Sequence, residues 1–267
     1  MIFYLIFFLL VLMYYYYFYN KKINFLSKKQ GCKVIKFLPY FKTFNSSDYR
    51  VRNCKNINQC MNNYCKNVKS FSSKEKKVIT KFINQVKNHP LLKSYNWKFI
   101  RVNDIENSYP HTQKDCIIIS DTFMNEIIRN KGSTTLIHEQ IHILQRIASK
   151  KMHQHLKEEL HFYPVNKIKG VEQYLLKSRS NPDEDLNQLW VYKNKILPLC
   201  LYNQEPNQLN DASYYGLKIK NNEVISKLIP LHHLKEYEHL KLGNNYYNGY
   251  EVQAEYLEQQ ISKDIFG

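Results

Sequence analysis

The chain has 267 residues, enough for one main domain with a sizeable core. Its 39 Lys and Arg residues outnumber 23 Asp and Glu residues, and the formal net charge of +16 would suit an anionic partner. The excess is spread along a chain rich in Lys, Asn, Ile and Tyr, without an Arg-rich helix or an RNP-like strand, so we do not expect a nucleic-acid partner.

An uncharged apolar segment opens the chain. Residues 2–19, IFYLIFFLLVLMYYYYFY, match the length of a helix that crosses a bilayer, and Lys21 and Lys22 follow. Neither Ala nor Gly occurs before Gly31 to mark a cleavage site. The segment therefore predicts a retained, single-pass transmembrane anchor at residues 1–20 and a membrane location, with the tyrosines at the membrane interface.

Two signals disagree on which side of the membrane the remaining chain lies. No basic residue precedes the segment while several lysines follow it, which favours a cytoplasmic domain. The six cysteines, four of them in residues 21–70, favour a disulfide-stapled region in an oxidising compartment. Their spacing includes no CxxC pair, which argues against a zinc knuckle. Residues 21–70 are expected to form a basic, Cys-rich, membrane-proximal segment.

Three regular elements are predicted between residues 71 and 120. Residues 72–90, SSKEKKVITKFINQVKNHP, offer an N-cap serine, apolar residues at helical spacing and a stop at Pro90, which together predict a helix. Residues 96–102, NWKFIRV, alternate in polarity as a strand does. Residues 116–120, CIIIS, form a short β-branched run typical of a strand.

The next motif, STTLIHEQIHILQ at residues 133–145, combines polar and apolar side chains in a way that suggests a metal site. A helix over residues 133–149 places His138 and His142 one turn apart on a common edge, so both imidazoles can meet one ion. Glu139 lies about 100° around that helix and can face a metal-bound water as general base, the H-E-x-x-H arrangement. The alternative is two surface histidines, but unpartnered polar groups on a buried face cost about 1 to 3 kcal/mol each.

A third ligand is expected from residues 248–260, NGYEVQAEYLEQQ, which predict a second helix. Glu251 and Glu255 lie one turn apart on it, and the small Ala254 between them permits two helices to approach closely. A carboxylate ligand needs this approach because it must lie about 2 Å from the metal. An ordinary exposed acidic helix is the alternative. The competing ligand candidates follow soon after the first helix, in KEELHF: Glu158, Glu159 and His161.

At these two motifs the chain resembles the gluzincin zinc metallopeptidases, the H-E-x-x-H group that includes thermolysin and takes its third zinc ligand from a glutamate on a later helix. In several branches that helix reads E-x-x-A-D, where this chain reads E-V-Q-A-E. The resemblance implies that His138, His142 and Glu251 bind Zn²⁺ and that Glu139 activates water. It also implies that Glu255 hydrogen-bonds a ligand histidine, although its side chain is one methylene longer than aspartate.

The same resemblance suggests how a substrate binds. It implies that strand 116–120 edges the cleft and pairs with an extended peptide; a core strand is the equally open alternative. Hairpins between the two helices are expected to wall the cleft, with four candidate lining residues: Trp190, Tyr192, Tyr214 and Tyr215. Spacing does not choose among the candidate oxyanion donors, which are His232, His233, Tyr246, Tyr247 and Tyr250. The metzincin pattern fails because Ala148 occupies its third-histidine position.

Residues 71–267 are thus expected to form an α+β, zincin-like metallopeptidase domain. Its active-site helix packs on a small sheet and on a second, ligand-bearing helix, with the N-terminal transmembrane helix attached. The predicted function is that of a membrane-anchored zinc metalloendopeptidase acting on peptide or protein substrates. The alternative is a non-catalytic membrane or virion-surface protein that retains a zincin-like fold, and the intact Glu139 favours the enzyme.

Overall fold

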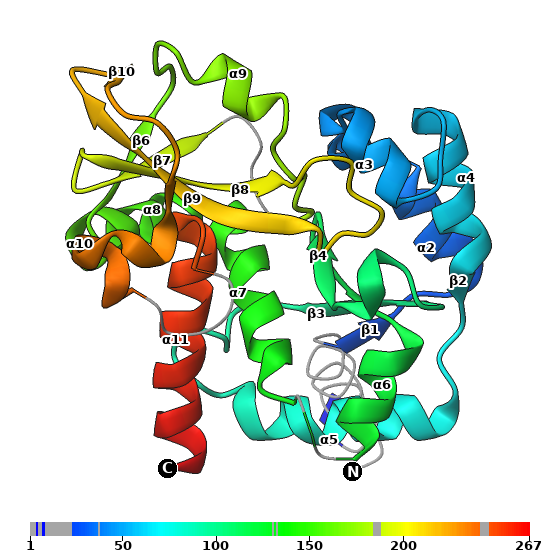
Figure 1. The fold of residues 1–267 in the computed structure, drawn as a ribbon. Coiled ribbons are helices and arrows are strands. Elements are labelled where there is room, and N and C mark those ends of the chain that lie inside the picture. Colours follow the sequence, from blue (N-terminus) through cyan, green and yellow to red (C-terminus); the bar gives the residue numbers. More distant parts are fainter. Residues whose placement is uncertain are drawn as a thin grey trace.

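The structure is a computed structural model, and it describes residues 4, 7, 8, 23–36, 38–129, 131, 133–183, 188–240 and 246–267. The α-helices are α2 (Lys28–Ile35), α3 (Ser46–Val51), α4 (Ile57–Asn67), α5 (Ser73–Val86), α6 (Asp121–Ile128), α7 (Thr135–Ile147), α8 (Ser149–Glu158), α9 (Glu172–Leu175), α10 (Lys235–Glu238) and α11 (Gly249–Phe266). Three short 3₁₀ helices are η1 (Pro39–Thr43), η2 (Glu106–Ser108) and η3 (Leu231–His233). The strands form two sheets, so the fold is α+β (Figure 1).

The first sheet has five strands in the order β1-β3-β5-β4, with β2 also paired to β3. Its members are β1 (Ile23–Phe25), β2 (Val68–Lys69), β3 (Trp97–Val102), β4 (His111–Gln113) and β5 (Cys116–Ile119). The pairs β1–β3 and β3–β5 are parallel, whereas β4 runs antiparallel to β5. The edge of this sheet is therefore β4, and the strand expected at the edge, β5, lies inside the sheet.

Helices cover both faces of the first sheet. Side chains alternate along β5, so Ile117 and Ile119 join one apolar cluster, with α5, α6, α7 and α11. Cys116 and Ile118 join another cluster on the opposite face, with α2 and α4. This burial on both faces explains the continuous apolar run of β5. The helix that carries the H-E-x-x-H motif, α7, is thus held between the sheet and α11 (Figure 1).

Residues 21–70 were expected to stand apart as a membrane-proximal segment, but the structure builds their described part into the same core. Both β1 and β2 pair with β3, and α2 and α4 pack against the sheet. Two disulfides, Cys32–Cys65 and Cys54–Cys60, cross-link this region. They confirm the prediction that the four early cysteines are paired.

Local signals placed several elements correctly. Ser72 caps α5, since its side chain accepts a hydrogen bond from Glu75 N while Glu75 accepts one from Ser72 N. The predicted strands at 96–102 and 116–120 correspond to β3 and β5. The predicted helices at 133–149 and 248–260 correspond to α7 and α11.

The second sheet comes from the residues between α7 and α11. Its order is β10-β9-β8-β7-β6, with β11 paired to β9, and every pair is antiparallel. A Cβ on Gly249, at the start of α11, would lie 3.0 Å from a ring carbon of Phe162 on β6, so glycine allows α11 to begin close to this sheet. The strands are β6 (Phe162–Val165), β7 (Leu189–Tyr192), β8 (Ile196–Tyr202), β9 (Ala212–Lys220), β10 (Glu223–Val224) and β11 (Ile229–Pro230).

The prediction of a membrane anchor is corrected by the structure. Within the described part of the chain, no helix is both long and apolar enough to cross a bilayer. The longest candidate, α11, has 18 residues but carries charged side chains along its length. Most of the expected span, residues 2–19, lies outside the described residues. The expected zincin-like fold with a transmembrane helix is thus replaced by an α+β fold with two sheets, whose topology does not by itself make it a zincin.

Candidate metal centre

Two imidazoles meet on the face of α7 that turns toward α11. His138 and His142 are one turn apart, and their Nε2 atoms lie 3.0 Å from each other. Their neighbours on the apolar stripe, Leu136, Ile137 and Ile141, are fully buried against the sheet and α11. The hydrophobic packing of α7 therefore fixes the two rings side by side.

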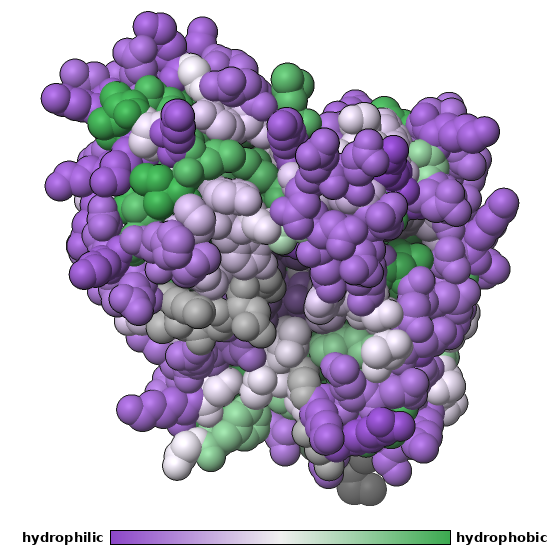
Figure 2. Space-filling view, in the orientation of Figure 1, coloured by the Kyte–Doolittle hydropathy of each residue, from purple (hydrophilic) through white to green (hydrophobic). Residues whose placement is uncertain are grey.

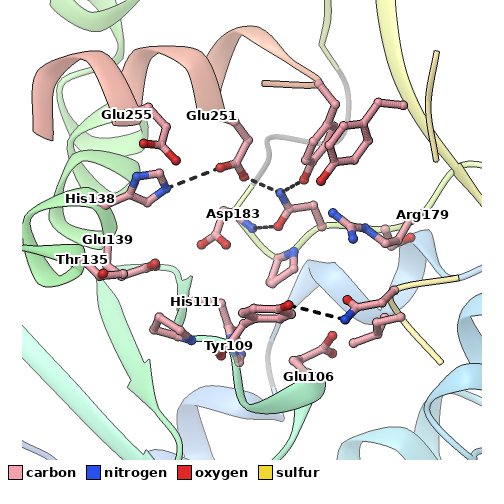
Figure 3. A pocket seen from close by; sticks show the side chains of 18 of the residues that line it. Glu106, Tyr109, His111, Thr135, His138, Glu139, Arg179, Asp183, Glu251 and Glu255 are labelled. Atoms are coloured by element: carbon pink, nitrogen blue, oxygen red, sulfur yellow. Dashed lines mark hydrogen bonds and ion pairs between the residues drawn. The ribbon is translucent and has the colours of Figure 1, made fainter. Parts of the chain in front are cut away.

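Glu251 of α11 completes a triangle of ligand atoms. Its Oε2 lies 3.4 Å from His138 Nε2 and 3.6 Å from His142 Nε2. Ligands about 2.0 to 2.1 Å from a tetrahedral zinc ion are about 3.3 to 3.4 Å apart, so these separations suit one such ion. All three side chains are buried, with at most 7 % of each residue exposed. Figure 3 shows His138 on α7 facing Glu251 on α11.

The polar partner of His142 fixes its tautomer. His142 Nδ1 lies 2.8 Å from Gln145 Oε1, while Gln145 Nε2 donates to the Tyr250 carbonyl at 2.8 Å. A carbonyl oxygen only accepts, so the amide nitrogen of Gln145 must face Tyr250 and its oxygen must face the ring. The proton of His142 then sits on Nδ1, and the lone pair of Nε2 points toward His138 and Glu251.

Glu258 orients the ring of His138 as Gln145 orients that of His142. Its Oε2 lies 3.3 Å from His138 Nδ1 and can accept the ring proton, which leaves Nε2 facing Glu251. Burial opposes protonation of His138, but hydrogen bonds to Glu251 and Glu258 outweigh it and raise the pKa of His138 well above its ordinary value. The surroundings thus favour positive charge at this point. A metal cation between the two Nε2 atoms and Oε2 would supply it.

The outer oxygen of Glu251 is held from the other side of the cleft. Asn181 Nδ2 donates to Glu251 Oε1 at 2.6 Å, and the same amide contacts Tyr247 Oη. Burial alone would raise the pKa of Glu251, but His142 and His138 beside it lower that pKa well below its ordinary value. Glu251 is therefore held as an anion with one oxygen directed at the histidines.

Glu139 lies beside this triangle and faces the cleft. It is buried, and its Oε2 has no hydrogen-bond partner among the described residues. Burial raises the pKa of Glu139 well above its ordinary value, and the negative charges of Asp183 and Glu251 raise it further. A buried carboxylate oxygen without a protein partner is suited to a water molecule, which is what a general base needs.

Glu255 does not occupy the position expected for it. It is half-buried on α11 and makes no hydrogen bond to His138, whose Nδ1 instead contacts Glu258. Burial raises the pKa of Glu255 above its ordinary value, and the neighbouring Glu258 adds to this effect. Because residues 251, 255 and 258 share one face of α11, the crossing of α11 over α7 decides which carboxylate reaches the ring. The sequence indicates that these three carboxylates share one face of the helix, but it does not indicate how α11 crosses α7.

The competing ligand candidates lie away from the site. Glu158 and Glu159 end α8, and Glu158 accepts hydrogen bonds from Gln154. Among the described residues, two groups of three potential ligands have atoms within 4.8 Å of one another: His138, His142 and Glu251, and His138, Glu255 and Glu258. Neither group includes Glu158, Glu159 or His161.

The triangle opens into a cleft of about 450 Å³ between the two sheets. Figure 2 shows the surface hollowed near the middle of this face, with hydrophilic side chains at its depth. Tyr109 and His111 line one side, close to the edge strand β4, and the residues from Arg179 to Asp183 line another. At that edge Thr112 donates both its N–H and its hydroxyl to Asp183 Oδ1, each at 2.6 Å.

Of the predicted wall and oxyanion candidates, the structure places two in the lining of the cleft. Tyr214 and Tyr247 line the cleft and stack on each other with ring centroids 4.9 Å apart. Four of the others pack in the apolar clusters around the second sheet: Trp190, Tyr192, Tyr215 and Tyr246. His232 and His233 are exposed in η3, and Tyr250 contacts His153. Tyr247 is therefore the oxyanion candidate that the fold brings to the site.

Several supporting residues carry only weak signals in the sequence. Gln145 follows His142 by three positions, a helical spacing that suggests contact but not its role. Asn181 belongs to an Asn-Pro pair that indicates only a turn. Comparison with known proteins found no matching family model, no matching curated protein and no matching solved structure. The geometry and chemistry of the site therefore carry the functional argument.

Proposed function

We propose that this protein is a zinc-dependent metallopeptidase, as its resemblance to the gluzincin ligand pattern suggests. The observation that carries the proposal is the buried triangle of His138 Nε2, His142 Nε2 and Glu251 Oε2, with the unpartnered Glu139 beside it in an open cleft. Two nitrogens and one oxygen suit zinc, and three protein ligands leave a fourth position for water.

The donor set fits a cation on electrostatic grounds as well. Glu258 and Gln145 each accept the Nδ1 proton of one histidine, so both Nε2 lone pairs converge on the Glu251 carboxylate. The three atoms lie 3.0 to 3.6 Å apart and need a positive charge among them, which either a proton on His138 or a metal cation supplies. Zinc bound there would act as a Lewis acid and lower the pKa of its bound water. That water could then attack the carbonyl carbon of an amide as a nucleophile.

The chain's own residues supply the remaining steps of peptide hydrolysis. Glu139 Oε2 would accept a proton from the attacking water and pass that proton to the leaving amine. Tyr247, in the wall of the cleft, can donate its hydroxyl proton to the carbonyl oxygen where negative charge develops. An extended peptide would pair with the main chain of the edge strand β4 by displacing Asp183 and Arg146, which contact the N–H and the carbonyl of Thr112.

Metal content provides the first test. The purified full chain should bind about one zinc ion, and His142→Ala should lose it because one of three ligands is gone. The matched control is His232→Ala, since His232 is exposed in η3 and lies outside the cleft. Zinc content can be measured by inductively coupled plasma mass spectrometry after gel filtration. Equal zinc content in all three proteins would contradict the proposed ligand set.

Hydrolysis provides the second test. Glu139→Gln should keep zinc but cleave a quenched fluorescent peptide library about 10²- to 10⁴-fold more slowly, because an amide cannot accept the proton from water. The control is Glu126→Gln, an exposed glutamate on α6. Equal cleavage by wild type and Glu139→Gln would remove Glu139 from the reaction. Zinc binding without cleavage by the wild type would instead favour a non-catalytic binding protein.

A further inference from the structure

A second charged feature of the cleft is the side chain of Arg179. The backbone N–H of Arg179 donates to the Cys200 carbonyl at 2.9 Å, and the neighbouring Ser178 forms a β-bridge to Leu201. Strand β8 therefore holds the backbone of Arg179 in place. The guanidinium lies 5.2 Å from the centre of the Tyr247 ring and lines the cleft. Figure 3 shows it pointing into the pocket.

Within the part of the chain that the structure describes, no carboxylate matches the charge of Arg179. The other arginine that lines the cleft, Arg52, pairs with Asp48 and Glu106 at 2.8 Å each. No carboxylate of the described residues forms an ion pair with Arg179; its neighbours are the phenol of Tyr247 and the ring of Tyr214. Arginine presents a planar fork of N–H donors that matches a carboxylate, and a poorly solvated guanidinium gains most from such a partner.

The position of Arg179 relative to the metal ligands defines where a ligand would bind. Tyr247 contacts Asn181, which in turn holds Glu251, so two side chains link Arg179 to the ligand triangle on the Glu251 side. The acidic residues that line the cleft on α11, Glu255 and Glu258, lie instead beside His138. Arg179 therefore lies on the Glu251 side of the ligand triangle, whereas Glu255 and Glu258 lie on the His138 side.

We propose that Arg179 forms a subsite that binds a carboxylate of the substrate close to the bond that is cleaved. This inference rests on the proposed peptidase function and specifies the substrate class: peptides with an acidic side chain, or with a free chain terminus, at this subsite. Tyr247 and Tyr214 provide the aromatic floor beside the guanidinium. The carboxylate of the substrate pairs with a guanidinium that no carboxylate of the described residues contacts.

The experiment measures peptide binding, so it does not depend on turnover. Full-length Glu139→Gln loaded with zinc is titrated with fluorescent, N-blocked, C-amidated decapeptides that carry one Glu at each position in turn, or Gln in its place. A charge-assisted hydrogen bond predicts that the best Glu peptide binds about 10- to 100-fold more tightly than its Gln counterpart. Adding Arg179→Met should reduce this ratio to about 1, and Arg179→Glu should favour a Lys peptide.

Controls separate recognition of charge from a structural effect. Arg50→Met, at an exposed arginine on α3, should keep the full Glu-to-Gln ratio. Each ratio compares two peptides on the same protein. A general loss of packing around Tyr247 would weaken the binding of both peptides and leave the ratio unchanged. Zinc content and circular dichroism confirm that each variant is folded. If Arg179→Met does not fold, the parent protein decides by itself, because equal binding of Glu and Gln peptides together with equal binding of the free and amidated C-termini overturns the proposal.

The remaining outcomes identify the source of the carboxylate. A neutral decapeptide with a free C-terminus that binds more tightly than its amide, and loses the advantage in Arg179→Met, assigns the subsite to a chain terminus. A Glu side chain that acts within an amidated peptide assigns it to an internal acidic residue. A ratio that survives Arg179→Met overturns the proposal. Hydrolysis by the wild type without any charge preference would overturn this subsite alone and leave the peptidase function standing.

Discussion

Removing the carboxylate of Glu258 should weaken zinc binding more than removing that of Glu255. Glu258 Oε2 lies 3.3 Å from His138 Nδ1 and holds the ring with Nε2 directed at Glu251. Glu255 is half-buried and makes no hydrogen bond to the described residues. The two residues are one turn apart on α11, so each substitution removes one negative charge from the same part of the same helix.

The structure sets the size of the effect. A hydrogen bond to a charged group contributes about 1.5 to 3 kcal/mol, and the 18 % exposure of the Glu258 side chain favours the lower part of this range. Glu258→Ala should therefore raise the Kd for zinc by about 10- to 30-fold, as expected for a residue that orients a metal ligand. Glu258→Gln keeps an acceptor without the charge and should fall between Glu258→Ala and the wild type. Glu255→Ala should change the Kd by at most about fivefold.

Zinc affinity can be measured by competition with a chromophoric chelator at pH 7.5, with circular dichroism to confirm folding. The order of the Kd values is the decisive result. An equal or larger effect of Glu255→Ala would show that the orientation of His138 does not depend on its contact with Glu258. No effect of either variant would show that packing of the ring alone orients it.

Three further predictions concern the disulfides, a buried thiol and the edge strand. Replacing Cys32 and Cys65 by serine opens a cross-link between residues 33 positions apart and should lower the free energy of unfolding by about 3 to 4 kcal/mol; an unchanged urea midpoint would contradict this. Burial raises the pKa of Cys116 to about 12, so the thiol stays protonated at pH 8 and should react with iodoacetamide only after unfolding, as followed by mass spectrometry. Asp183→Ala frees the N–H and hydroxyl of Thr112 and should lower KM for peptides that pair with β4; a KM that does not fall would argue against binding along this edge.

The elements that the sequence predicted correctly depend on interactions between near neighbours. The capping pair Ser72 and Glu75 is three residues apart, and the apolar stripe of α7 repeats at helical spacing. His138 and His142 meet because the helix itself brings them together. Such patterns are visible in any stretch of sequence that forms one helix, whatever it packs against.

Strand order depended on pairings that local patterns do not contain. The run at β5 is apolar because helices cover both faces of the sheet, which agrees with the core-strand alternative and not with the cleft edge that the gluzincin resemblance implied. The actual edge, β4, has three residues and a polar composition, His-Thr-Gln, so it gave no strand signal. Residues 21–70 were expected to lack sustained periodicity, but they form the helices α2, α3 and α4 between two strands of two or three residues each.

The polar residues around the candidate ligands were the least predictable part of the site, because their contacts join residues that are far apart in the sequence. The contact between Asn181 and Glu251 spans 70 positions, and that between Gln145 and Tyr250 spans 105. Neither Asn nor Gln carries charge or a metal-ligand pattern, so nothing in the sequence distinguishes these two from the many other amides. Yet they decide which oxygen of Glu251 faces the histidines and which nitrogen of His142 keeps a free lone pair. The ligand types can be predicted from two motifs, whereas the state in which they bind depends on contacts that only the assembled fold creates.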